Sequence, residues 1–122
     1  MSAIAAVSLT RDILLGEWHN TNAKGLFSRL LIRDNHDAAE VHAYGRLANG
    51  EADWGAVPAS VYSFKFETST GEAFSALYEF EDARVRLQAN VKLGVLVVAI
   101  FVEFRDQRVD HFDREFFHRV RS

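Results

Sequence analysis

Four side chains that could take part in acid–base or binding chemistry recur at every second position of one segment: Glu40, His42, Tyr44 and Arg46. Alternate residues of a β-strand point to the same face of a sheet, so a strand here presents these groups in one row. Such a row could line a polar cavity with a general base, a hydroxyl donor and an anion clamp. It could instead face water, because the residues between them are small enough for an inner face: Val41, Ala43 and Gly45. Small inward residues leave room for a ligand, so both interpretations allow a pocket.

A second candidate is the tripeptide Asp53-Trp54-Gly55. A tryptophan beside a carboxylate can serve as a platform for a sugar or a heterocycle at the mouth of a pocket. The alternative is an aromatic plug that closes the structure. Tyr62 and Tyr78 lie on segments where aromatic residues alternate with others, and we take both as candidate ligand contacts.

The last strand-like segment carries two aromatic and two basic residues on one face: Phe112, Arg114, Phe116 and His118. We expect this face to point inward. Arg114 then needs a partner, because burying an unpaired charge is costly. Trp18 or a carboxylate such as Glu103 could supply it, or Arg114 could join His42 as a polar anchor for a ligand.

Metal and covalent chemistry have little support in the sequence. The chain has no cysteine, and its five histidines lack the short spacings of metal-ligating pairs. It also lacks a G-x-S-x-G elbow and a phosphate-binding glycine loop. We therefore expect neither a metal nor a cofactor.

Length and charge narrow the class of protein further. The 122 residues suffice for one domain, residues 1–122, and the net charge of −3 does not favour nucleic-acid binding. The longest apolar run, residues 93–102, is about half the length of a membrane-spanning helix. We expect a cytoplasmic protein that binds neither nucleic acid nor membranes.

The alternation of apolar and polar residues predicts an all-β protein. Strands are expected near 17–21, 26–34, 39–47, 52–57, 60–68, 73–81, 84–92, 94–105 and 109–120. The fourth and fifth could be one strand kinked at Pro58, because proline donates no backbone hydrogen bond. The connections are short, which favours a single antiparallel up-and-down β-barrel of eight to nine strands. A short helical turn is expected within residues 8–15.

The start of the first strand adds a resemblance to a known group. Leu15-Gly16-Glu17-Trp18, the series of hairpins and an arginine in the last strand resemble the calycins, which include lipocalins, fatty-acid-binding proteins and avidins. The resemblance implies that Gly16 and Trp18 are structural, and that Arg114 or Arg119 packs over Trp18 in a cation–π contact. The segment 41–45 followed by Asp53-Trp54-Gly55 is similar to small uncharacterised bacterial barrel proteins, which imply no activity.

Eight-stranded barrels can enclose one small ligand. The expected function is therefore to bind an apolar or aromatic small molecule inside the barrel, through His42, Tyr44, Trp54, Tyr62, Tyr78 and Arg114. One alternative is an isomerase- or cyclase-type enzyme that pairs His42 with a carboxylate such as Glu103 or Asp53. Another is an interaction module whose barrel is filled with side chains.

The strand from Leu93 to Val102 is apolar on both faces, whereas the outer face of a lone barrel meets water. Two covers are conceivable: residues 3–15 folded back over the strand, or the same strand of a second subunit. A twofold contact pairs an apolar patch with itself. We expect a homodimer through this strand.

Overall fold

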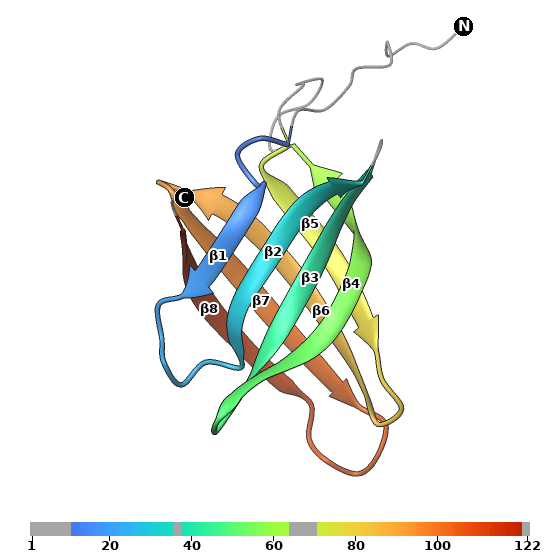
Figure 1. Cartoon of the computed structure of the whole chain (residues 1–122). Coiled ribbons are helices and arrows are strands. Elements are labelled where there is room, and N and C mark those ends of the chain that lie inside the picture. Colours follow the sequence, from blue (N-terminus) through green and yellow to red (C-terminus); the bar gives the residue numbers. More distant parts are fainter. Residues whose placement is uncertain (1–10, 36–37, 64–70, 121–122) are drawn as a thin grey trace, which may run out of the picture.

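The computed structural model describes residues 11–35, 38–63 and 71–120, and within them the chain forms a closed antiparallel barrel (Figure 1). Each strand pairs with the next in sequence, and the last pairs with the first. The strands are β1 (Gly16–Asn20), β2 (Phe27–Asn35), β3 (Ala38–Leu47), β4 (Gly50–Tyr62), β5 (Ala73–Glu79), β6 (Ala83–Lys92), β7 (Val95–Phe104) and β8 (His111–Arg119). The predicted all-β, up-and-down barrel is confirmed with eight strands, because β4 runs through Pro58 as one strand.

The described residues contain no helix, and thus none long and apolar enough to cross a lipid bilayer. The helical turn expected within residues 8–15 is not confirmed. Its first part lies outside the described residues. The rest is a hydrogen-bonded turn in which Leu14 N donates to Arg11 O at 2.8 Å.

Alternation along the strands forms the core, because every second side chain points into the barrel. On β3 the inward residues are buried and small, as the sequence pattern allowed: Ala39, Val41, Ala43 and Gly45. Larger inward side chains from the other strands complete one buried cluster, among them Trp18, Phe27, Leu30, Phe74, Tyr78, Leu87, Leu96, Ile100 and Phe117.

One end of the barrel is closed around Trp18. Its indole Nε1 donates to Leu14 O at 2.9 Å, and the Arg119 guanidinium lies 4.6 Å from the ring centroid. Arg119 also donates to the carbonyl oxygen of Ile13. Gly16 has a φ of 130°, a backbone conformation that favours glycine. Of the two arginines considered for the contact with Trp18, the structure therefore selects Arg119.

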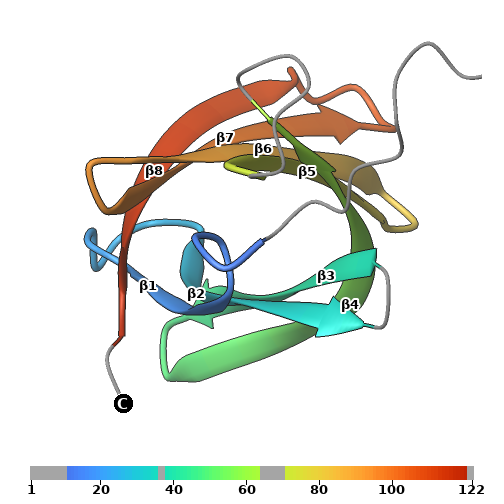
Figure 2. The ribbon, with the colours of Figure 1, turned by 90° about the horizontal axis from the view of Figure 1, so that it is seen from above.

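The barrel is flattened, with β1–β4 along one side and β5–β8 along the other (Figure 2). The ladder between β4 and β5 is short: in the described part of the chain, residues 59–62 of β4 pair with residues 73–76 of β5. Pro58 directly precedes the paired stretch and has no N–H to donate. Within the part of the chain that the structure describes, residues 50–58 of β4 therefore have no ladder pairing with β5.

Candidate functional site

The structure divides the six predicted ligand contacts into three pairs. His42 and Tyr44 lie on the outer surface of β3, and Trp54 and Tyr78 meet inside the barrel. Tyr62 and Arg114 line one hollow on the outer surface of β5–β8. The predicted residues thus form three separate places rather than one pocket.

A β-bulge between β3 and β4 links the first two pairs. His42 is opposite Ala56 and Tyr44 is opposite Asp53, so Trp54 and Gly55 together oppose one residue of β3. Gly55 has a φ of 80°, which a glycine adopts without steric cost. The motif Asp53-Trp54-Gly55 is therefore the bulge itself, and it sets the direction of the Trp54 side chain.

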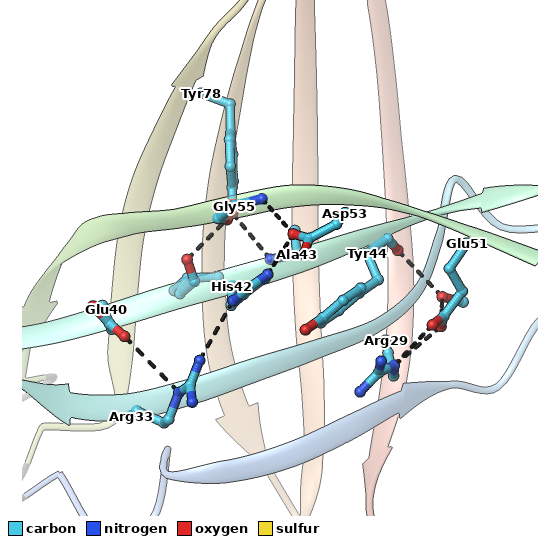
Figure 3. A network of polar contacts seen from close by, with 12 residues as sticks. Arg29, Arg33, Glu40, His42, Ala43, Tyr44, Glu51, Asp53, Gly55 and Tyr78 are labelled. Carbon is cyan, nitrogen blue, oxygen red and sulfur yellow. Dashed lines mark hydrogen bonds and ion pairs between the residues drawn. The ribbon is translucent and has the colours of Figure 1, made fainter.

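Asp53 holds the bulge from outside. Its Oδ1 accepts a hydrogen bond from Gly55 N at 2.8 Å and lies 2.5 Å from His42 Nε2 (Figure 3). The Gly55 N–H, followed by the His42 ring, holds the pKa of Asp53 below its usual range. The carboxylate that could have served as an acid–base partner of His42 is thus committed to the backbone.

Tyr78 holds the same bulge from inside. Its hydroxyl accepts from Ala43 N at 2.9 Å and donates to Gly55 O at 2.6 Å, with Val41 O at 3.2 Å (Figure 3). These backbone groups are next to the irregular pairing, and a buried group left unpaired would cost free energy. Burial raises the pKa of Tyr78 to about 12, because the phenolate is disfavoured away from water.

The outer surface of β2–β4 carries a continuous polar network. The Arg29 guanidinium lies 3.8 Å from the centroid of the Tyr44 ring, and Tyr44 stacks on His42 with centroids 4.6 Å apart. Arg29 also binds Glu51 at 3.0 Å. Hydrogen bonds from Arg29 and Ser28 lower the pKa of Glu51. These groups already contact one another. A structural role therefore fits the row of alternate polar residues on β3, which runs from Glu40 to Arg46.

Trp54 fills the interior beside the separation of β4 and β5. Its ring packs edge-on against Phe27, Tyr78 and Phe80, with centroids 4.8, 5.4 and 5.0 Å away. A Cβ at Gly45 would stand 2.5 Å from the indole nitrogen, so only glycine fits under this ring. Trp54 is half-buried. Trp54 therefore occupies the space that the small residues of β3 leave open. It lies on the stretch of β4 that does not pair with β5 in the ladder.

The expectation that Arg114 points inward is wrong. On β8 the exposed face is the one with Phe112, Arg114 and Phe116, while Glu115 and Phe117 are buried. Arg114 lines an outer hollow of about 610 Å³, together with Tyr62, Val97, Ala99 and Phe116.

Glu115 is a buried residue that sequence patterns missed. Glu115 is 3% exposed, and its carboxylate accepts hydrogen bonds from Asn20 Nδ2 at 2.8 Å and Leu26 N at 2.7 Å. It thereby ties the β1–β2 connection to the barrel, and the pairing explains why β8 turns this face inward. Burial, with the nearby Asp113, raises the pKa of Glu115. The sequence signal that could have revealed this is the spacing of Glu115 and Phe117, which are two positions apart and therefore share one face of the strand.

The described residues include no group of three or more histidines and carboxylates that could hold a metal ion. No known protein-family model, curated protein or solved structure matched the chain.

Proposed function

We propose that this protein binds one small apolar or aromatic molecule inside the barrel, in the space that Trp54 now fills. The observation that carries the proposal is the position of Trp54. It is a half-buried ring over a floor of small residues, beside the stretch of β4 that does not pair with β5 in the ladder.

Displacing the indole requires little reorganisation of the backbone. Residues 50–58 do not pair with β5 in the ladder, so the ring can leave without breaking that ladder. A ligand ring in its place would keep edge-to-face contacts with Phe27, Tyr78 and Phe80, contacts that aromatic pairs favour. Binding pockets are commonly apolar and aromatic in this way.

In this proposal the predicted contacts have unequal roles. Trp54 and Tyr78 border the ligand, whereas His42 acts through Asp53 by fixing the bulge that carries Trp54. Tyr44 supports His42 by stacking, and Tyr62 and Arg114 belong to another surface.

We also propose a relation to the calycin barrels. The support is the closed eight-stranded meander together with Gly16 and the packing of Arg119 on Trp18. A cytoplasmic location stays a prediction.

The enzyme alternative depends on the pair of His42 and Asp53, 2.5 Å apart. Because Asp53 also caps Gly55 N and lies on the outer surface, the geometry favours the structural role. Binding is therefore the better-supported function.

The test uses 1-aminoanthracene, a neutral aromatic dye whose emission rises in apolar surroundings. Ala43→Leu enlarges an inward side chain of β3 opposite the bulge that carries Trp54, and Ala56→Leu makes the same change on the outer surface of β4. We expect saturable dye binding that Ala43→Leu weakens more than tenfold and Ala56→Leu leaves unchanged.

Circular dichroism checks that both variants fold. If Ala43→Leu does not fold, Ala76→Leu, an inward change on β5, replaces it in the test. Absence of saturable binding would contradict the proposal. So would binding that survives both inward substitutions or is abolished instead by Ala99→Glu on the outer hollow.

A further inference from the structure

We propose that the outer surface of β5–β8, here called the β5–β8 wall, binds the same wall of a second copy in a twofold homodimer. This inference is independent of the ligand proposal. It begins from β7, whose outward side chains are apolar even though they face away from the core: Val95, Val97, Ala99 and Phe101. Outward residues of an antiparallel sheet are polar when they face water.

The wall has two unlike halves. Aromatic side chains project from β8, where Phe112 is 52% exposed and Phe116 is 46% exposed. Besides Arg86, the β5–β6 half carries smaller or uncharged polar groups at the same levels: Ala73, Ser75, Leu77, Gln88 and Asn90. The hollow of about 610 Å³ lies between the two halves. A protruding half beside a recessed half is a self-complementary surface, which an isologous contact requires.

The strand register defines how two walls would meet. Three cross-strand rows run over the wall: Ala73–Asn90–Val97–Phe116, Ser75–Gln88–Ala99–Arg114 and Leu77–Arg86–Phe101–Phe112. A twofold axis parallel to the strands, between β6 and β7, sets each row against itself in reverse order. Phe116 then faces Ala73 of the second copy, and Phe112 faces Leu77.

The position of Arg114 disfavours a perpendicular axis through its row. Among the residues that the structure describes, those that line the hollow include the cations Arg114 and Lys92 and no carboxylate. An axis across the strands through the row of Arg114 would place two guanidinium groups together, which is repulsive. The parallel axis instead places Arg114 against Ser75, next to Tyr62, where hydroxyl oxygens can accept its hydrogen bonds.

Of the other conceivable cover, residues 3–15, the structure describes residues 11–15. Leu14 is buried at the end of the barrel, and Arg11 binds Asp34 of β2 at 2.7 Å, on the opposite side of the barrel from β6 and β7 (Figure 2). Arg11 and Leu14 thus contact β2 and the end of the barrel rather than the three rows of the β5–β8 wall, and we take a second copy as the occupant.

Sedimentation velocity from about 1 to 100 μM tests the dimer. We expect the wild type to reach twice the monomer mass of 13.8 kDa. Ala99→Glu places a carboxylate in the centre of the contact and should raise the dissociation constant more than about 100-fold. The matched variant Ala56→Glu, on the exposed face of β4, should leave it unchanged. Val97→Glu replaces Ala99→Glu if the latter fails to fold.

A crosslinking experiment tests the axis, because the chain has no cysteine of its own. A mixture of Ser75→Cys and Arg114→Cys proteins should crosslink with a short bismaleimide more efficiently than either variant alone. A wild type that stays at monomer mass overturns the proposal, as does a dimer that survives both Ala99→Glu and Val97→Glu. Equal crosslinking of the single variants and the mixture would overturn the parallel axis.

Discussion

At the scale of single residues, the segments 41–45 and 53–55 form one structural device. Asp53 binds the bulge from the solvent side and Tyr78 binds it from the core, while Gly45 and Gly55 supply the space and the backbone conformation. The result is a fixed direction for Trp54. Residue types that suggest catalysis therefore serve here to position an aromatic ring.

Tyr78→Phe should lower the free energy of unfolding by about 1–3 kcal/mol, because it leaves Ala43 N and Gly55 O without their hydroxyl partner. Urea denaturation at one low protein concentration measures the change. Tyr44→Phe is the control, since its hydroxyl has no hydrogen-bond partner in the part of the chain that the structure describes; it should stay within about 0.5 kcal/mol.

The wild type and Tyr78→Phe together also test the pKa of Tyr78. The folded state keeps this proton until about pH 12, whereas an unfolded tyrosine releases it near 10. The unfolded state therefore binds fewer protons between these values, and stability falls as the pH rises, by up to about 1.4 kcal/mol per pH unit. Tyr78→Phe should lack this part of the decline. Parallel curves for wild type and variant between pH 10 and 12 would contradict the assignment.

At the scale of elements, periodicity predicted the strands well and their faces unevenly. On β3 small residues alternate with large polar ones, and the small face is the buried one. On β8 both faces mix aromatic and charged residues, so alternation alone could not choose between them. The choice depends on Glu115, whose partners come from a connection distant in sequence. The bulge and the short β4–β5 ladder likewise depend on pairing between strands.

The β6–β7 turn contains a residue that conflicts with its own backbone. Leu93 has a φ of 52° and is 94% exposed, and Gly94 follows with a φ of 79°. Asparagine tolerates this conformation far better than leucine. Leu93→Asn should therefore raise the free energy of unfolding by about 1 kcal/mol. The control Leu47→Asn, at an exposed site without a positive φ, should give no gain in the same thermal or urea unfolding experiment.

At the scale of the whole molecule, the barrel has two sides with different chemistry. The outer surface of β1–β4 is a network of paired charges, whereas the centre of the β5–β8 wall carries apolar side chains beside Arg114 and Lys92. The sequence already indicated this contrast, because the segment that forms β7 is apolar on both faces. It could not indicate which residues of neighbouring strands share a row, because the register is a property of the folded sheet.

The most direct test of the account follows the fluorescence of Trp54 itself. Trp18→Phe leaves Trp54 as the sole tryptophan. Titration of this variant with 1-aminoanthracene should quench the Trp54 emission by energy transfer, and the quenching should saturate at the same dye concentration as the emission of the dye. The Trp54 ring should also become more accessible to acrylamide, so that acrylamide quenches its remaining emission more strongly, because the ligand takes the place of the ring. Dye binding that leaves the emission and the accessibility of Trp54 unchanged would contradict the central claim.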